Sequence, residues 1–249
     1  MASGILILGK LCFAAIGIAV GARLGRDLRS RGEMGLHAVA LAAICIGGIG
    51  LAAIPIGQSL GDTPTGTGIA LTGEWSMRAG MLLFCVFIWR TFRPEGLLGG
   101  CAAGGCAALL IGALVFDLLS QPSWAHYDYG LPSAQLNQLS MALPFAWSCL
   151  ESGVLWGRAR RRLALGLADP GVVRRYLLWW CVMLCFVLIC LLAMAAGEAR
   201  DAGRNGLADT AQVTRGILFL GVTALAWLGF FSSGRKTPAA AATSSDTDS

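Results

Sequence analysis

The chain has 249 residues, of which 56% are hydrophobic and only 13% are charged, and its mean hydropathy is +0.68. A soluble globular domain is roughly 45–50% apolar and about 25% charged, so the composition excludes an ordinary water-soluble protein. The formal net charge of +5 does not indicate nucleic-acid binding, because the basic residues separate apolar runs and form no patch with aromatic side chains.

Seven apolar runs follow one another along the chain, and each approaches the roughly 20 residues that a helix needs to cross hydrocarbon. Unpaired backbone groups are excluded from lipid and a period-two alternation is absent, so these runs predict transmembrane helices. We expect an all-α integral membrane protein, a seven-helix bundle over residues 1–236, and a disordered cytoplasmic tail over residues 237–249. The predicted helices cover about residues 4–22, 36–57, 75–93, 98–119, 138–157, 176–197 and 214–232.

The basic residues predict how the bundle is oriented. Most of the 19 lie in the first, third and fifth connections or after the last run, so the positive-inside rule predicts the N-terminus outside and the C-terminus in the cytoplasm. Lys10 interrupts the first run, and no basic residue precedes it, so we expect this helix to be retained and not cleaved as a signal peptide. The basic residues predicted on the cytoplasmic side are Arg23, Arg26, Arg29, Arg31, Arg90, Arg93, Arg158, Arg160, Arg161, Arg162, Arg174, Arg175, Arg235 and Lys236.

Glycines and connections give further expectations about packing. Gly17 and Gly21 in the first run form a GxxxG pair, and so do Gly100 and Gly104 in the fourth. Small residues let helices approach closely in lipid, so we expect the fourth helix to be central and tightly packed. Residues 57–72, rich in Gly and Thr, are expected to be a flexible connection. The order of the runs also fits two parallel three-helix repeats joined by a linker helix, a 3+1+3 arrangement found in some transporters.

The cysteine and histidine content argues against a metal site. All nine cysteines fall inside apolar runs, no CxxC pair occurs and the chain has only two histidines. Cysteine behaves in such surroundings as a small hydrophobic residue, so we expect free thiols, no metal and no cofactor.

Glu151 is the strongest candidate for a functional residue. It lies about 12 positions into the fifth run, or about 18 Å along a helix axis, and a carboxyl inside a span is by default a functional hypothesis. It shares one helix face with Asn137, Ser140 and Ser148. This polar seam either lines a ligand cavity or proton path, or Glu151 bonds a neighbouring helix or Arg158 for packing alone.

A second candidate is an outer polar cluster made of Lys10, Glu74, Arg78 and Arg215. Glu74 and Arg78 are four residues apart, so they can pair on one helix face. Lys10, Arg78 and Arg215 all fall at predicted outer helix ends, where together they can hold an anion. Two alternatives stay open, an interfacial ion pair of Glu74 with Arg78 and a Lys10 side chain that extends to the headgroups.

Three segments carry a resemblance to a known family. They are GARLGRDLRSRG (21–32), FIWRTFRPEG (87–96) and RRRLALGLADPGVVRRYLLW (160–179). With them, most of the chain resembles a family of uncharacterised bacterial membrane proteins with seven transmembrane helices. The resemblance implies the topology and a location in the bacterial cytoplasmic (inner) membrane, and it implies no mechanism.

No constellation of catalytic side chains is visible, so we expect no enzyme. The first hypothesis for function is a receptor-like or accessory module that binds a small or lipidic ligand between its helices. The alternative is a small-solute or proton-coupled transporter that uses Glu151. Beyond the lipid bilayer itself, anionic lipid at the arginine-rich connections or a cytoplasmic protein is the expected partner.

Overall fold

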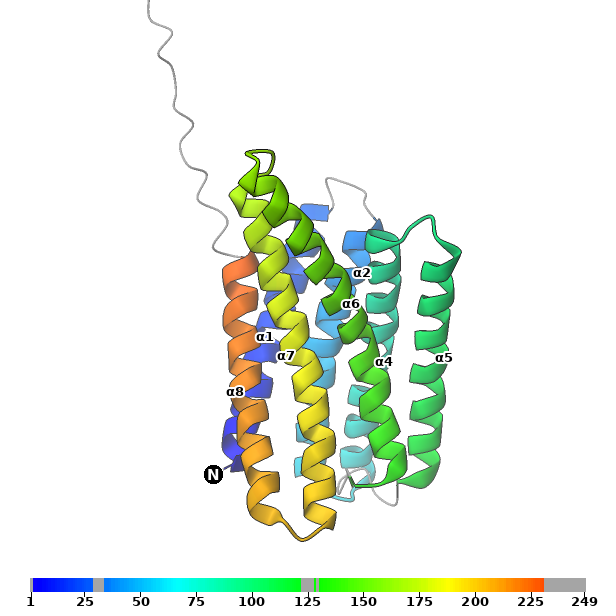
Figure 1. Cartoon of the computed structure of the whole chain (residues 1–249). Coiled ribbons are helices and arrows are strands. Elements are labelled where there is room, and N and C mark those ends of the chain that lie inside the picture. The colour runs from blue at the N-terminus through cyan, green and yellow to red at the C-terminus, as the bar shows by residue number, and fades with distance from the viewer. Residues whose placement is uncertain (1, 29–33, 122–127, 129, 231–249) are drawn as a thin grey trace, which may run out of the picture.

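In the computed structural model, the chain forms a bundle of long helices (Figure 1). The structure describes residues 2–28, 34–121, 128 and 130–230, and every regular element in these ranges is helical. The helices are α1 (Ala2–Leu28), α2 (Met34–Ala43), η1 (Ile44–Gly50), α3 (Leu51–Ser59), α4 (Pro64–Phe92), α5 (Leu97–Ser120), α6 (Pro132–Ala164), α7 (Pro170–Asp201) and α8 (Asn205–Phe230). Because α2, the π-helix η1 and α3 follow without a break, the described residues form seven rods.

Six of these rods are long and apolar enough, by length and composition, to cross a membrane. The predicted all-helical fold is thereby confirmed, and the six apolar helices are consistent with a membrane protein. The exception is α6, whose polar residues keep it below the hydropathy of the other six. The six candidate spans are residues 4–26, 37–59, 64–92, 97–120, 170–201 and 205–229.

The expected flexible connection over residues 57–72 is wrong, because most of it is helical. α3 continues to Ser59, and α4 begins at Pro64, eleven residues before the predicted apolar run. Thr63 caps the new helix, since its side chain accepts a hydrogen bond of 3.0 Å from the backbone N–H of Gly66, and Pro64 suits the first turn. The Gly/Thr content of this segment reflects close packing, because a Cβ at Gly57 would lie 2.5 Å from the backbone nitrogen of Ala70.

The two GxxxG pairs behave differently. A Cβ at Gly17 would lie 2.8 Å from the carbonyl oxygen of Ala43, so α1 packs closely on the rod that begins with α2. Nothing lies within 4 Å of a Cβ at Gly104, and among the described residues α5 packs only against α4 and α6. The expectation of a central fourth helix is therefore wrong. The motif shows that two small residues share a helix face, but not that this face meets another helix.

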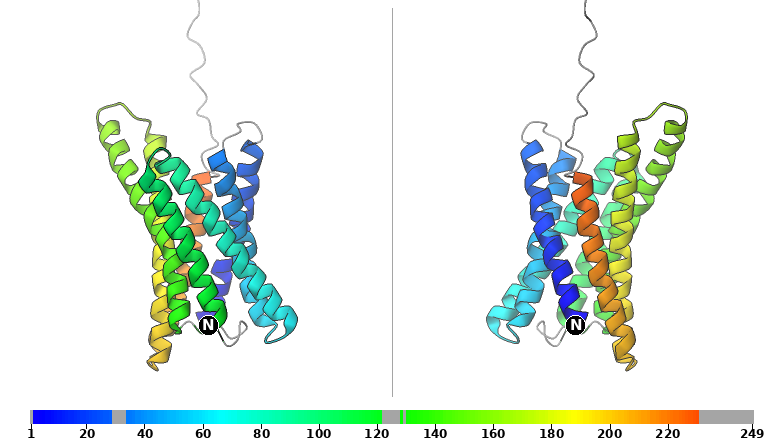
Figure 2. Two further views of the ribbon diagram at one scale, coloured as in Figure 1. Left: turned by 90° about the vertical axis from the view of Figure 1, so that its right-hand side faces the viewer. Right: turned by 90° about the vertical axis from the view of Figure 1, so that its left-hand side faces the viewer.

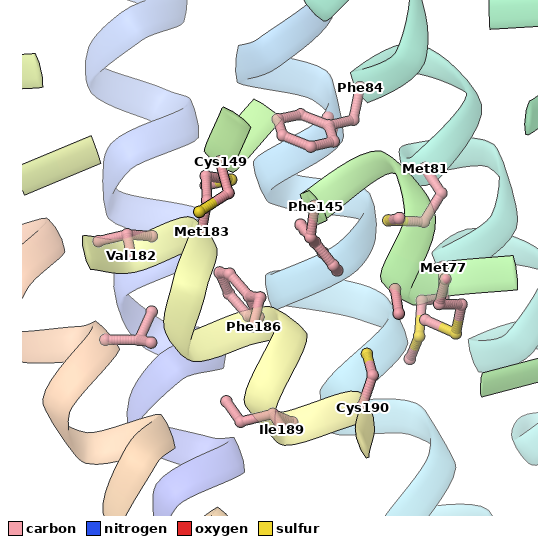
Figure 3. Close-up of a cluster of buried hydrophobic side chains, with 14 of the residues drawn as sticks. Met77, Met81, Phe84, Phe145, Cys149, Val182, Met183, Phe186, Ile189 and Cys190 are labelled. Atoms are coloured by element: carbon pink, nitrogen blue, oxygen red, sulfur yellow. The ribbon is translucent and has the colours of Figure 1, made fainter. Parts of the chain in front are cut away.

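The centre of the bundle is filled by aromatic, aliphatic and sulfur-containing side chains from α4, α6 and α7 (Figure 3). Phe145 and Phe186 stack with ring centroids 4.6 Å apart and an interplanar angle of 14°. All nine cysteines are free thiols, as the sequence predicts. The core thus holds together by packing and not by covalent links.

The two ends of the bundle differ in their connections. α1 begins at one end, called here the N-terminal end, where the chain also turns from α7 to α8 (Figures 1 and 2). At the opposite end, the α6–α7 hairpin projects beyond its neighbours (Figure 2). The described arginines at 158, 160–162, 174 and 175 belong to this hairpin. Arg29, Arg31, Arg235, Lys236 and the predicted tail over residues 237–249 lie outside the described residues.

Candidate ligand site at the N-terminal end

Five helices bring polar side chains together in the half of the bundle nearest the N-terminal end. We call this set the charged cluster. It joins the four predicted residues of the outer polar cluster to Asp117 and Asn137. Its members are Lys10 of α1, Glu74 and Arg78 of α4, Asp117 of α5, Asn137 of α6 and Arg215 of α8.

Asp117 lies at the centre of a hydrogen-bond network, and its side chain has no solvent exposure. Its carboxyl accepts hydrogen bonds from Asn137 Nδ2 at 2.9 Å, Ser133 Oγ at 3.0 Å and Gln121 Nε2 at 3.2 Å. The donors come from α6 and from the end of α5 itself. A buried carboxyl is costly unless it is hydrogen-bonded, so this network fixes α5 against the polar face of α6.

Asn137 links this network to the arginine of α4. Its Oδ1 accepts a hydrogen bond from Arg78 Nη2, which also pairs with Glu74 Oε2 at 3.3 Å. The guanidinium is 3% exposed, and its Nε and Nη1 have no hydrogen-bond partner among the described residues. The predicted pairing of Glu74 with Arg78 is therefore present, and it is buried inside the bundle.

Close helix packing places Lys10 beside Arg215. A Cβ at Gly9 would lie 2.7 Å from the carbonyl oxygen of Gly216, and a Cβ at Gly216 would lie 2.8 Å from Ile5 Cγ2. These two glycines therefore let α1 and α8 touch at the level of the two basic residues. Arg215 Nη1 donates a hydrogen bond of 2.9 Å to Gln212 Oε1.

A cavity of about 70 Å³ opens against this set of charges. Lys10, Glu74 and Arg215 line it, together with Gln138. The other walls are apolar and come from η1, α3, α4, α6, α7 and α8. The remaining lining residues are Ile46, Leu51, Ile54, Met77, Met141, Phe145, Phe186, Ile189, Cys190 and Phe219. A space of this size with charged groups on one side of its wall admits water molecules or a compact ion.

The predicted polar seam of α6 is divided between the two ends of the bundle. Asn137 belongs to the charged cluster, and Ser140 bonds only locally, donating to the carbonyl oxygen of Asn137 at 2.7 Å. Ser148, on the same face, accepts a hydrogen bond of 3.0 Å from Trp179 Nε1. No hydrogen bond between described residues joins Ser140 to Ser148, so the seam is not a continuous hydrogen-bonded chain.

Glu151 lies toward the opposite end of the bundle, away from the charged cluster. Its Oε1 accepts hydrogen bonds from Arg93 Nε at 2.9 Å and from Trp147 Nε1 at 3.4 Å. The side chain is 15% exposed and Arg93 is 60% exposed. The packing alternative predicted a bond to a neighbouring helix or to Arg158, and the partner found is Arg93, the residue that follows α4.

Asp117, Ser133 and Gln121 are site residues that the sequence analysis did not single out. Asp117 lies inside the apolar run at 98–119, where an ionisable residue is by itself a functional hypothesis. That signal was present in the sequence. Ser133 and Gln121 lie outside the predicted runs, and only the folded structure brings them to Asp117.

Comparison of the chain with protein-family models, with curated proteins and with solved structures finds no match.

Proposed function

We propose that the protein is a receptor-like or accessory module that binds a small anionic ligand between its helices. In this proposal it is a seven-span protein of the bacterial cytoplasmic membrane, related to the bacterial seven-helix family that it resembles. The N-terminal end of the bundle faces outward, so the ligand binds in the outer half of the membrane. The arginine-rich end faces the cytoplasm.

The distribution of side chains on α6 supports a seventh span. Its polar residues point inward, and Ser133, Asn137, Ser140, Ser148 and Ser152 are all buried. Its exposed face is apolar and carries Leu139, Leu143, Leu150 and Val154. A helix in water shows the opposite arrangement, whereas lipid favours an apolar outer face and hydrogen-bonded polar groups inside. The low hydropathy of α6 therefore comes from side chains that lipid does not touch.

The orientation rests on the arginines. Those that the structure describes at the ends of α1, α4 and α6 and the start of α7 lie at the end opposite to the N-terminus. An excess of basic residues marks the cytoplasmic side. Arginines near the surface attract anionic lipid by about 1 kcal/mol each. The projecting α6–α7 hairpin is thus a surface for anionic lipid or for a cytoplasmic partner.

The cavity of the charged cluster is the observation that carries the proposal. The cluster contains three basic side chains, Lys10, Arg78 and Arg215, but only two acidic ones. Arg78 is already bonded to Glu74 and Asn137. Lys10 has no hydrogen bond or ion pair with any residue that the structure describes, although it lines the cavity. An excess of basic groups in a low-dielectric space favours a bound anion.

Ligand-induced stabilisation tests this proposal. The purified protein in maltoside micelles is heated with increasing acetate or phosphate at constant ionic strength. We expect a saturable rise in the unfolding temperature for at least one of these anions, because a ligand that binds only the folded state stabilises it.

The variant Arg215→Gln should lose most of this stabilisation, whereas Arg93→Gln, at the opposite end, should retain it. Equal stabilisation of Arg215→Gln and the parent protein by every anion would contradict the proposal. The alternative function, a transporter that uses Glu151, stays a prediction. The contacts of Glu151 do not favour a role in transport over that of a structural ion pair.

A further inference from the structure

A second cavity lies inside the bundle next to the one that the charged cluster lines. Its volume is about 100 Å³, and all of its walls are apolar or aromatic, with residues from α1, α2, η1, α4, α6, α7 and α8. Residues such as Leu24, Val39, Trp179 and Ala226 place it nearer the arginine-rich end. We call it the apolar cavity, and the one beside Lys10 and Arg215 the charged cavity.

The two cavities share part of their walls. Ile46, Phe145 and Phe186 line both of them. Phe145 of α6 and Phe186 of α7 are the stacked pair of the core, and Figure 3 shows their rings side by side between these helices. A single layer of side chains therefore separates a space with basic groups from a space without any.

Two of the three shared residues lie on irregular stretches of helix. Ile46 is in the π-helix η1, and π-helical segments in long helices occur frequently at functional sites. Phe145 directly follows Pro144, which lies inside α6 and has no N–H to donate to the carbonyl of Ser140. The third shared residue is Phe186, and neither its ring nor that of Phe145 carries a polar group that could form a hydrogen bond. This layer is consequently held by packing alone, on helices whose regular hydrogen bonding is interrupted beside two of its three residues.

We propose that the ligand is a single-chain amphipathic carboxylate of medium length. This inference rests on the proposed function, which supplies the anion site. The carboxylate binds in the charged cavity against Lys10 and Arg215, where the small volume favours a compact headgroup. The alkyl tail passes between Ile46 and the Phe145/Phe186 pair and ends in the apolar cavity. An engineered apolar cavity of about 150 Å³ holds a benzene molecule, so the apolar cavity accommodates only the last few carbon atoms of a tail.

Trp179 provides a direct probe, because its ring lines the apolar cavity and its indole is fixed by Ser148. Bromine quenches tryptophan fluorescence at short range, so 8-bromooctanoate is titrated into the protein in maltoside micelles. The chain has eight tryptophans, and the difference between the parent protein and Trp179→Phe isolates the signal of Trp179. We expect a saturable Trp179 component that octanoate displaces. Octyltrimethylammonium, which has the same tail and the opposite charge, should not displace it.

Chain length and cavity filling separate the tail from the headgroup. Octanoate should bind at least tenfold more tightly than acetate, which is the gain from burying about two methylene groups. Ala226→Phe adds a ring at the wall of the apolar cavity and should reduce this advantage below threefold while acetate still binds. The matched control Ala224→Phe, at an exposed position of the same helix, should keep the full advantage.

Two negative results have different meanings. If acetate binds but octanoate binds no more tightly and Trp179 is not quenched, the amphipathic ligand is ruled out and the anion site stands. If neither carboxylate binds and phosphate also fails, the proposed function itself fails.

Discussion

Asp117 and Glu151 are two carboxyls inside one bundle, and their surroundings differ sharply. Asp117 is fully buried and accepts hydrogen bonds from three side chains, two on α6 and one that directly follows α5. Glu151 is 15% exposed and pairs with Arg93, which is 60% exposed. Asp117 joins the consecutive helices α5 and α6, whereas Glu151 joins α6 to the end of α4, and only Asp117 is fully buried.

This difference decides how much each carboxyl contributes to the fold. A buried polar network costs several kcal/mol when one member is removed, because the remaining groups stay buried and unpaired. An exposed ion pair is worth about 0–1 kcal/mol, since water and salt replace the lost partner. We therefore expect the charged cluster to be sensitive to substitution and the Arg93–Glu151 pair to be tolerant.

Asp117→Ala should have the largest effect, a loss of about 3–5 kcal/mol in the free energy of unfolding. The substitution leaves Asn137, Ser133 and Gln121 without their acceptor in a dry environment. Unfolding in mixed micelles with increasing denaturing detergent measures the change. Asp117→Asn keeps the shape and one acceptor oxygen, so its loss should be about half as large. A loss below about 1 kcal/mol for Asp117→Ala would show that the network contributes little.

Asn137→Leu should cost about 2 kcal/mol, because this side chain bonds both Arg78 and Asp117. A double-mutant cycle with Asp117→Ala sharpens the test. The combined loss should be smaller than the sum of the two single losses by at least about 0.5 kcal/mol, since both substitutions break the same network. Strict additivity would mean that the two residues do not act together.

The sequence predicts the helices of this bundle well where their length and composition follow from the thickness of the bilayer. Six long apolar helices were predictable, because a length near 20 residues and the exclusion of charge follow from the thickness of hydrocarbon. Helix ends were less predictable, since caps such as Thr63 and Asp169 extend helices into polar segments. α4, for example, begins well before its apolar run.

Which side chains meet inside the bundle was predictable only in part. Lys10, Glu74, Arg78 and Arg215 lie in the same half of the bundle, but Glu74 and Arg78 are well inside α4 and not at the outer helix end that the sequence predicts, because α4 begins at Pro64. Glu151 is among the predicted site residues and Asp117 is not, since depth along a helix does not tell which face meets a neighbour. The same gap explains Gly104, where a Cβ would meet no atom within 4 Å, although Gly100 of the same GxxxG pair lies next to Trp89 of α4.

Ser133→Ala should cost about 1 kcal/mol, the typical value of one neutral hydrogen-bond donor in a buried network. Its hydroxyl is one of three donors to Asp117, so the carboxyl keeps two others. Ser120→Ala is the matched control, because that hydroxyl is exposed and bonds only to the carbonyl of Phe116 in its own helix. The control should change the stability by less than about 0.5 kcal/mol. An equal effect of the two variants would remove the distinction between buried and exposed polar groups.

Glu151→Gln should have the smallest effect, at most about 1 kcal/mol, and it should leave acetate binding unchanged. The glutamine retains an oxygen for the Arg93 and Trp147 donors, and the 60% exposed Arg93 can be hydrated in place of the lost charge. The loss of stability should also shrink as the salt concentration rises, because exposed charges are screened over about 10 Å at 0.1 M.

Arg93→Gln should give a similar loss of stability, and the double variant should lose no more than either single variant. A loss comparable to that of Asp117→Ala, or a loss of anion binding, would reverse the order of the two carboxyls. The stability loss would mean that Glu151 is a structural residue as important as Asp117, and the loss of anion binding would mean that the ligand site extends to Glu151.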